Sequence, residues 1–393
     1  MQNFTYYAPT EVIFGKNAEE RTGKEVKKWG GSRVLLVYGG GSVKKSGLLE
    51  KIQKDLTKEN IQWDELGGVK PNPRLSLAEA GVEKALKIGA DFILAVGGGS
   101  TIDTAKAIAH GAANPELDLW DIWTEKVPLK KSLPVGTVLT ISAAGSEMSD
   151  SAVLTNEKIG KKKGLSTELN RVKFAIMNPE LTYTLPKYQV TCGIVDIMMH
   201  TLDRYFTHSK GNEITDEIAQ ALLRTVIKNG RKAFDNPKDY QAMSELMWCG
   251  SLSHNGITGL GAEKDFGPHK IGHELSAKYD VAHGASLSAI WKAWAEYVYM
   301  EEPDRFAQYA RTVWGIQEMD SVKAACLGIE ATVDFFRSIH MPVSIGELEI
   351  GVRPEEELDD MAARATGNDT FTVAKFKELH EKDILEILKK ANH

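Results

Sequence analysis

Cysteine is scarce in this chain, which has three in 393 residues: Cys192, Cys249 and Cys326. No two of them form a CxxC pair. Their number and spacing therefore argue against a disulfide framework and against a zinc site made of thiolates. The same scarcity predicts a reducing environment, and we expect the protein to be cytoplasmic.

Long apolar runs and an excess of positive charge are also lacking. No stretch of about 18 consecutive apolar residues occurs, so we expect no membrane-spanning helix and no membrane as a partner. The N-terminal segment lacks the basic start and apolar stretch of a signal peptide. Lysine and arginine total 48 against 54 for aspartate and glutamate, a formal net charge of −6 at pH 7. That balance argues against nucleic acid as a partner.

The first half of the chain alternates between two patterns. Short apolar runs at residues 34–38, 92–96, 134–142 and 174–179 are typical of strands buried on both faces. Helical patterns at residues 48–60 and 75–88 lie between the first two runs. Strands and helices that alternate in this way predict βαβ units, and hence a Rossmann-like parallel sheet.

The texture changes after residue 185. The β-branched runs fade, and helical patterns follow at residues 191–206, 214–234, 240–250, 285–299, 303–313 and 322–338 and in the C-terminal segment. We therefore predict two domains, an α/β domain over residues 1–185 and an all-α domain over residues 186–393.

Two of the apolar runs end in the same four residues, GGGS, at residues 39–42 and 97–100. A glycine turn before a helix lets the backbone approach a phosphate, and amides at the helix start favour negative charge. The second turn is the better candidate, because the following TIDTAKAIA is typical of a helix. The strict GxGxxG and Walker motifs are absent. The alternative is a tight turn with a serine cap and no ligand.

The first turn carries no acid at the end of its strand. In dinucleotide sites an Asp or Glu there binds the ribose 2′-hydroxyl and excludes a 2′-phosphate. Glycines leave room, Ser42 can donate a hydrogen bond, and Lys44 and Lys45 follow closely. The turn therefore favours NADP(H) over NAD(H). The alternative is that these lysines merely occupy a helix start.

Histidine is concentrated, because six of the ten lie between His200 and His283. Asp196 and His200 are four residues apart in an apolar helical segment, so they share one helix face and enter a buried region. A buried carboxylate needs a cation, and a divalent metal would provide one. An Asp–His hydrogen bond is the commoner arrangement for such a pair.

More histidines follow in the segment GPHKIGHELSAKYDVAHG, which contains His269, His273 and His283. Three histidines and one aspartate form a nitrogen and oxygen set suited to Fe²⁺ or Zn²⁺. Spacing alone does not decide which histidines are ligands, since His208 and His254 are also present. The HExxH pattern is absent, which disfavours a metalloprotease.

Taken together, the motifs resemble a known family. GGGSTIDTAKAIA, DIMMH and PHKIGHELSAKYDVAHG are similar to segments of the iron-containing (group III) alcohol dehydrogenases. KPNP, TISAAGSE and TNEK resemble the branch of butanol dehydrogenases and broad-range aldehyde reductases. The resemblance spans essentially the whole chain.

The resemblance implies a role for each matching residue. The metal ligands would be Asp196, His200, His269 and His283, and His273 would relay a proton or position the substrate. Gly97, Gly98, Gly99 and Ser100 would hold the pyrophosphate, and Gly39, Gly40, Gly41 and Ser42 would surround the adenine ribose. Other residues lining the cofactor cleft would be Asn72, Asp103, Thr140, Ser142 and Lys162. Family members with Asp at the Gly39 position prefer NAD, and this chain departs from them.

We therefore expect hydride transfer between NADP(H), or less readily NAD(H), and a small primary alcohol or aldehyde such as butanol or butanal. One divalent metal, Fe²⁺ or Zn²⁺, would act as a Lewis acid on the substrate oxygen. Two alternatives stay open: a metal- and NAD-dependent lyase of the dehydroquinate-synthase type, and a non-catalytic nucleotide-sensing module. A homodimer is expected from the resemblance and from base rates.

Overall fold

The computed structural model describes all residues from Met1 to His393, and it divides the chain into two compact units. The α/β unit comprises Tyr7–Leu185, and the helical unit comprises Met1–Tyr6 and Pro186–His393. The six N-terminal residues, which the sequence placed in the first domain, therefore belong with the second. The reason is a contact with a segment that is distant in sequence: the backbone amide of Gln2 donates to the carbonyl of Gly261 at 2.9 Å.

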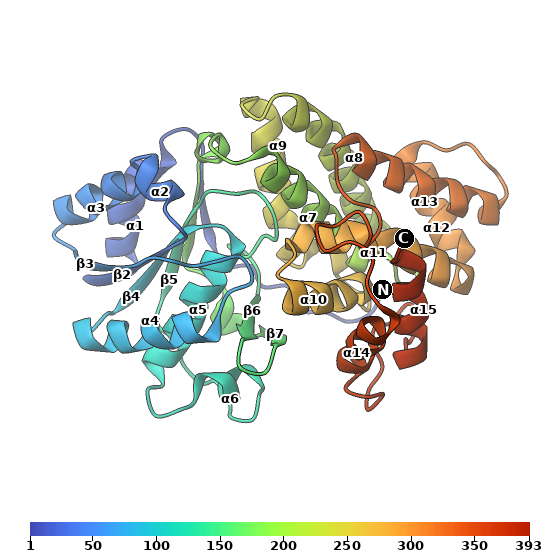
Figure 1. Cartoon of the computed structure of the whole chain (residues 1–393). Coiled ribbons are helices and arrows are strands. Elements are labelled where there is room, and N and C mark those ends of the chain that lie inside the picture. The colour runs from blue at the N-terminus through green and yellow to red at the C-terminus, as the bar shows by residue number, and fades with distance from the viewer. The chain divides into compact units, whose positions relative to one another are not determined.

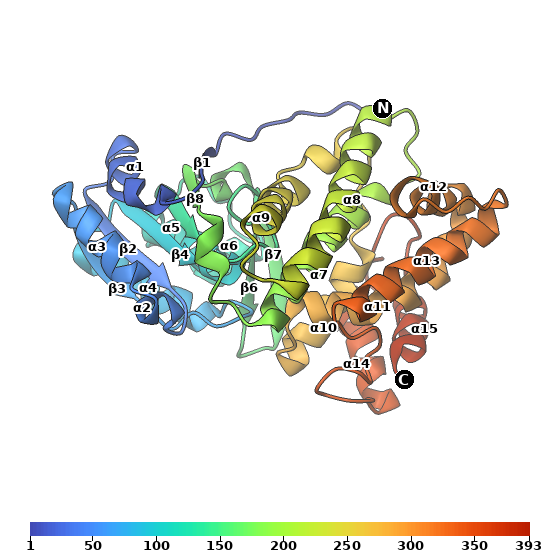
Figure 2. The ribbon, with the colours of Figure 1, turned by 90° about the horizontal axis from the view of Figure 1, so that it is seen from above.

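The α/β unit is built on a six-stranded sheet in the order β1-β8-β5-β4-β2-β3, with every neighbouring pair parallel (Figure 1; β1 and β8 are labelled in Figure 2). Its strands are β1 (Glu11–Phe14), β2 (Arg33–Tyr38), β3 (Gln62–Leu66), β4 (Phe92–Gly97), β5 (Val135–Leu139) and β8 (Phe174–Met177). The antiparallel hairpin of β6 (Ser151–Asn156) and β7 (Lys161–Ser166) forms a second sheet. The predicted Rossmann-like parallel sheet is confirmed.

Helices cover both faces of the six-stranded sheet. They are α1 (Thr22–Lys28), α2 (Ser42–Lys45), α3 (Leu48–Lys58), α4 (Leu75–Ile88), α5 (Gly99–Ala113) and α6 (Leu119–Trp123). One face packs Leu36 and Leu94 of the sheet against Ile52 of α3, and all three side chains are fully buried. On the other face α4 and α5 pack together, with Ala78 and Ala107 in one apolar cluster. Because helices cover both faces of the sheet, β2 and β4 are continuous apolar runs.

The two glycine turns meet at one edge of this sheet. β2 and β4 are parallel neighbours, and Tyr38 lies opposite Val96 at their carboxyl ends. The turns that begin at Gly39 and Gly97 therefore follow adjacent strand ends. In open α/β sheets this edge is where ligands bind.

The helical unit contains nine α-helices (Figure 2). They are α7 (Lys187–Tyr205), α8 (Glu213–Asp235), α9 (Tyr240–His254), α10 (Gly267–Tyr279), α11 (His283–Val298), α12 (Pro303–Trp314), α13 (Ser321–Ser338), α14 (Glu355–Thr366) and α15 (Glu381–Ala391). The predicted all-α character of this region is confirmed. None of the helices combines the length and the apolar character needed to cross a bilayer.

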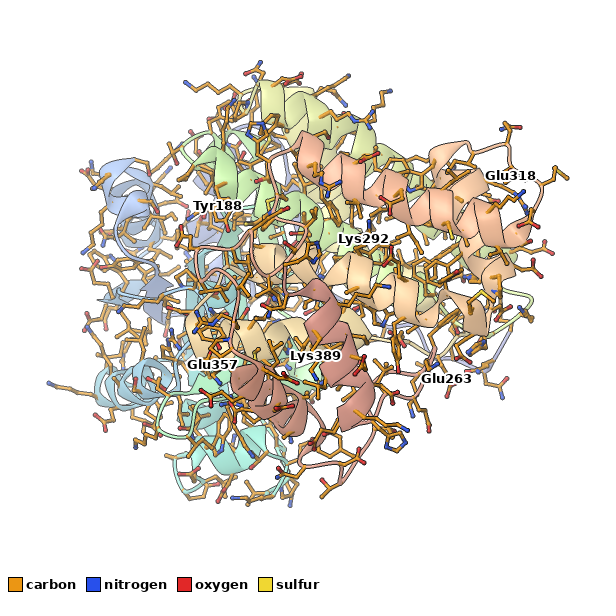
Figure 3. All side chains as sticks on the ribbon, turned by 45° about the vertical axis from the view of Figure 1, so that its right-hand side comes forward. Tyr188, Glu263, Lys292, Glu318, Glu357 and Lys389 are labelled. Carbon is orange, nitrogen blue, oxygen red and sulfur yellow. The ribbon has the colours of Figure 1, made fainter.

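Apolar packing, and not surface charge, holds the helical unit together. Phe206 and Phe306 stack with ring centroids 4.1 Å apart, and both rings are fully buried. On the surface Lys292 of α11 pairs with Glu330 of α13 at 2.6 Å; Figure 3 labels Lys292. Partly exposed ion pairs of this kind contribute about 0–1 kcal/mol each.

Candidate metal centre and cofactor turns

Asp196 and His200 lie one turn apart on the buried face of α7, and their side chains are 7% and 5% exposed. His200 Nδ1 lies 2.9 Å from both the backbone carbonyl and the carboxylate Oδ1 of Asp196. The surrounding residues of α7 are buried as well, including Ile197, Met198 and Met199. Asp196 and His200 therefore share one buried face of α7, as their spacing predicts.

His269 comes to the same place from the first turn of α10. Its Nε2 atom lies 3.9 Å from Asp196 Oδ1. On the other side of the ring, Nδ1 lies 2.5 Å from Oδ2 of Asp203, a fully buried carboxylate on α7. A carboxylate behind a histidine in this way fixes the ring orientation and directs the far nitrogen toward a metal.

The first turn of α10 is itself anchored by Asp265. Its carboxylate accepts hydrogen bonds from the backbone amides of Gly267 (2.8 Å), Lys375 (2.8 Å) and Phe376 (2.7 Å). Burial raises the pKa of Asp265 to about 6. These bonds tie the start of α10 to a distant segment, and they hold His269 where it meets Asp196.

His283 begins α11 and lies against α7. Its Nε2 atom is 3.7 Å from Asp196 Oδ1, and its side chain is 24% exposed. The next residue, Gly284, permits this approach, because a Cβ there would lie 2.1 Å from the carbonyl oxygen of Cys192. A side chain at Gly284 would therefore push the start of α11 away from α7.

These residues form a donor set that suits a divalent metal. Asp196, His200 and His269 each offer a ligand atom within 4.8 Å of the others, and all three are buried. Asp196 Oδ1 is buried and accepts no hydrogen bond, although three histidine nitrogens lie within 4 Å of it. A buried carboxylate oxygen in that position is costly unless a cation satisfies it. One carboxylate with imidazoles matches Fe²⁺ or Zn²⁺.

Two further histidines border this group and one lies apart from it. The His273 ring centroid is 5.3 Å from that of His283 and 6.3 Å from that of His269. The His254 ring lies against that of His200 in a tilted arrangement, with 4.1 Å between centroids. His208 instead contacts Glu302 (2.8 Å) and the carbonyl of Phe376 (2.6 Å). The structure therefore gives His208 a structural contact and places His254 against a predicted ligand.

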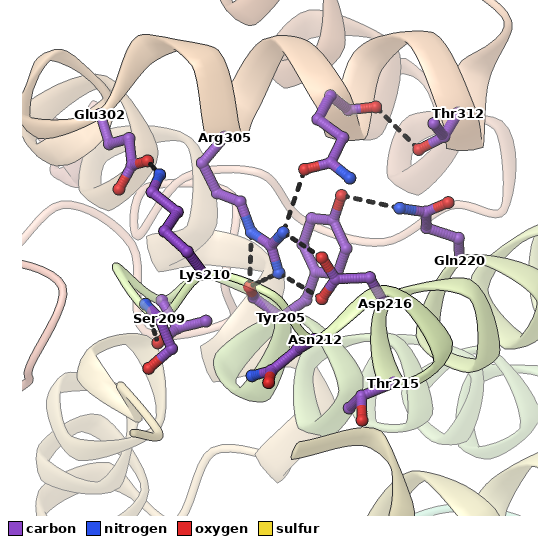
Figure 4. Close-up of polar contacts among 12 residues, drawn as sticks. Tyr205, Ser209, Lys210, Asn212, Thr215, Asp216, Gln220, Glu302, Arg305 and Thr312 are labelled. Atoms are coloured by element: carbon purple, nitrogen blue, oxygen red, sulfur yellow. Dashed lines mark hydrogen bonds and ion pairs between the residues drawn. The ribbon is translucent and has the colours of Figure 1, made fainter. Parts of the chain in front are cut away.

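The C-terminal end of α7 is clamped by Arg305 of α12 (Figure 4). The guanidinium forms two hydrogen bonds with Asp216, of 2.5 and 2.7 Å, and two with the carbonyl of Tyr205, of 2.9 and 2.6 Å. It also lies 3.9 Å from the centroid of the Tyr205 ring. The last carbonyl of a helix has no partner within the helix. Arg305 supplies one, and so fixes the helix that carries Asp196 and His200.

In the α/β unit, the turn after β4 is tightly packed. A Cβ at Gly98 would lie 2.1 Å from the Cγ2 atom of Ile141, so only glycine fits there without a shift. The amide of Thr140 donates to the carbonyl of Gly97 at 3.1 Å. The backbone at residues 97–100 therefore lies directly beside the segment that begins at Thr140. A turn without side chains at the start of α5 can receive a phosphate on its amides.

The segment after β5 contributes one polar atom with no hydrogen bond and one buried network. Ser142 Oγ is buried and has no hydrogen-bond partner, as expected for a group that would contact a ligand.

Asp103 instead accepts hydrogen bonds from Ser146 Oγ (2.6 Å) and the amide of Val153 (2.9 Å). Lys106, whose pKa burial lowers to about 8, donates to the carbonyls of Ser146 and Ser151. Both Asp103 carboxylate oxygens thus act within the fold.

Asn72 and Lys162, which lie ninety positions apart, contact each other. Lys162 Nζ donates to Asn72 Oδ1 at 2.9 Å. Asn72 is 4% exposed and adopts a φ of 55°. A left-handed backbone at a non-glycine residue is uncommon and is often associated with a functional constraint. The structure thus brings together two residues that the family resemblance assigned to one cleft.

A cavity of about 310 Å³ adjoins the first glycine turn. Two of the predicted cofactor residues, Ser42 and Thr140, line it. Glu19 and Lys51, which pair at 2.7 Å, also line it, together with Leu181 and Thr184. No sequence motif pointed to these four residues, because they come from segments that share no pattern.

The parallel sheet with its glycine turns and the Asp–His group are the features of a nicotinamide-dependent, metal-dependent dehydrogenase. Comparison with known families bears this out. Residues 9–179 match the model of the iron-containing alcohol dehydrogenases, and residues 190–392 match the C-terminal model of the same family. The chain belongs to the iron-containing alcohol dehydrogenase family, and it is an NAD(P)-dependent alcohol dehydrogenase that requires a metal.

Named relatives cover the whole chain. It is 39% identical to NADH-dependent butanol dehydrogenase A of Clostridium acetobutylicum, over 100% of both chains. It is 35% identical to the NADPH-dependent aldehyde reductase YqhD of Escherichia coli, over 88% of this chain and 89% of that one. The crystal structure of NADH-dependent butanol dehydrogenase A from Thermotoga maritima superposes with a TM-score of 0.96 at 37% identity, covering 100% of this chain and 99% of that one. The predicted family and branch are confirmed.

Proposed function

We propose that this enzyme interconverts small primary alcohols and aldehydes, with butanol and butanal as the test pair, and that it prefers NADP(H) over NAD(H). The observation that carries the proposal is the buried Asp196 carboxylate oxygen, which faces three histidine nitrogens and accepts no hydrogen bond. The substrate class is supported by the names of the relatives, which are butanol dehydrogenases and an aldehyde reductase.

The residues divide into holding and proton-handling roles. Asp196, His200, His269 and His283 would hold one divalent metal. When bound, that metal would supply Lewis-acid stabilisation of negative charge on the substrate oxygen. His273, beside His283, has the right side chain to pass a proton to or from water near neutral pH.

The α/β unit would hold the dinucleotide. Gly97, Gly98, Gly99 and Ser100 would bind the pyrophosphate, and Gly39, Gly40, Gly41 and Ser42 would surround the adenine ribose. Ser142, Thr140, Asn72 and Lys162 would contact other parts of the cofactor, and Asp103 would hold the segment that carries Ser146. The bound nicotinamide would give or accept the hydride.

The preference for NADP(H) rests on the turn after β2. No carboxylate follows Tyr38 there, so nothing on β2 excludes a 2′-phosphate. The relatives are divided on this point, since the butanol dehydrogenases are named NADH-dependent and the aldehyde reductase NADPH-dependent. The ratio of kcat/KM for NADPH to that for NADH, measured with butanal, decides the preference. A ratio below one refutes it.

The decisive test of the function is metal stripping. Enzyme treated with a chelator should lose butanal reduction, and Fe²⁺ or Zn²⁺ should restore it; comparing the two shows which ion supports the reaction better. Activity that survives complete removal of the metal contradicts the proposal. We also propose that the protein is cytoplasmic and that it forms a homodimer. Light scattering of the purified protein tests the oligomeric state.

A further inference from the structure

Lys44 and Glu65 form an ion pair beside the first glycine turn. Lys44 lies on α2, three residues after Gly41, and its Nζ atom is 3.1 Å from Oε1 of Glu65 on β3. The second oxygen of Glu65 accepts a hydrogen bond from Gln53 of α3 at 3.1 Å. The lysine is 51% exposed and the glutamate 33% exposed. Both charges therefore lie at the surface, within reach of a ligand.

Two contacts place this pair at the carboxyl edge of the sheet. The Lys44 ammonium lies 4.9 Å from the centroid of the Tyr38 ring, at the last residue of β2. Glu65 lies opposite Leu36 in the pairing of β2 with β3, one position before that strand ends. Hydrogen bonds to Tyr38 and to Glu65 raise the pKa of Lys44 above its ordinary value, so the ammonium stays charged.

We propose that Glu65 sets the choice between NADP(H) and NAD(H) by holding Lys44 away from a 2′-phosphate. Here Gly39 follows the end of β2, and the carboxylate that opposes the phosphate comes from the neighbouring strand β3. It acts through Lys44, because it offsets the charge of the ammonium and holds it 3.1 Å from its own Oε1 atom. Lys44 is the cation that would otherwise meet the phosphate. This inference rests on the proposed dinucleotide site at residues 39–42.

The test uses the metal-loaded enzyme and measures binding as well as activity. The probes are adenosine 2′,5′-bisphosphate and adenosine 5′-monophosphate, which differ only in the 2′-phosphate, and their dissociation constants are measured by calorimetry. Glu65→Gln should tighten binding of the bisphosphate by about two- to fivefold, the range expected for one exposed ion pair. Binding of the monophosphate should stay unchanged. The ratio of kcat/KM for NADPH over NADH should rise by the same factor.

A second variant tests whether Glu65 acts through Lys44. Lys44→Met should remove the route by which Glu65 acts, so adding Glu65→Gln to it should tighten binding of the bisphosphate much less than in the wild-type background. Glu59→Gln is the matched control. Glu59 pairs with Lys27 at 3.4 Å and precedes β3, at the opposite edge of the sheet, so both probes should bind as in the wild type.

Two results overturn the proposal. One is a Glu65→Gln variant that changes both probes by the same factor. The other is the full gain from Glu65→Gln when Lys44 is already methionine. This test can succeed even if the proposed preference for NADP(H) is wrong. An enzyme that uses mainly NADH should still bind the bisphosphate more tightly after Glu65→Gln.

Discussion

Asp203 lies directly behind His269, with its Oδ2 atom 2.5 Å from Nδ1 of the imidazole. Since Nδ1 is held by the carboxylate, Nε2 is left to face Asp196. The same helix therefore supplies two predicted ligands, Asp196 and His200, and the residue that orients a third.

Asp203→Asn should weaken the metal site without removing a ligand. The amide can still contact His269, but it no longer supplies the charge that makes the imidazole a stronger ligand. We expect metal affinity to fall by roughly 10- to 100-fold. Competition with a chelator of known affinity measures the change, and the melting temperature shows whether the variant is folded. A folded variant with wild-type affinity would contradict the positioning role.

His200→Ala and His273→Ala should separate metal binding from proton handling. His200 lies inside the donor group, so its loss should abolish stoichiometric metal binding. His273 borders the group, so its loss should leave the metal bound and reduce kcat by roughly 10²- to 10⁴-fold, the range for a general acid–base group. Metal content by elemental analysis and steady-state kinetics give the two readings. Loss of the metal in His273→Ala would show that the ligand assignment is wrong.

Asp216→Asn should destabilise the helical unit. The substitution leaves the Arg305 guanidinium, whose side chain is 7% exposed, without its charged partner. Removing one member of a buried pair costs about 3 kcal/mol of unfolding free energy. Urea denaturation followed by far-UV circular dichroism measures it. Asp334→Asn is the control, because Asp334 is 74% exposed and pairs with Arg337 at 3.9 Å, so a change below about 0.5 kcal/mol is expected.

His110 should make the stability of the α/β unit depend on pH. Burial lowers its pKa from 6.5 to about 4, and its ring nitrogens contact Ser132 Oγ and Asn170 Oδ1, both at 2.8 Å. Between pH 6.5 and 4 the unfolded chain binds a proton at this residue and the folded chain does not. The stabilisation is therefore complete above about pH 6.5 and is lost as the pH falls to 4, on the order of 3 kcal/mol.

His110→Gln tests this assignment. The amide can keep hydrogen bonds but does not titrate, so the variant should lack this part of the acid loss. Unfolding free energies of both proteins, measured at intervals from pH 7 to pH 4, should converge toward low pH. Parallel curves would mean that His110 contributes nothing to the acid sensitivity.

Sequence patterns predicted the elements that are buried and missed those at the edges. β2 and β4 carry continuous apolar runs because helices cover them on both sides, and their positions were predicted to within one residue. β3 has the sequence QWDEL and lies at the edge of the sheet, where none of its residues is fully buried. A half-exposed edge strand has no apolar run, so no pattern marked it. The β6–β7 hairpin was missed for a similar reason, since β7 begins with three lysines.

The site shows the same division. The family resemblance led to Asp196, His200, His269 and His283, and the structure places the three histidines within 4 Å of one carboxylate oxygen of Asp196. Asp203 was missed, although an acid three residues after His200 in an apolar helix is a usable signal. Asp265 and Arg305 left no such signal, because their importance comes from carbonyls and amides of segments that are distant in sequence. Backbone partners of this kind cannot be read from residue types.

The membership of Met1–Tyr6 in the helical unit has a consequence for synthesis on the ribosome. The α/β unit is one uninterrupted stretch, Tyr7–Leu185, so it can fold as soon as it has emerged. Met1–Tyr6 must wait, because Gly261, to which Gln2 bonds, is translated much later. This short segment therefore takes its place only after the α/β unit has been made.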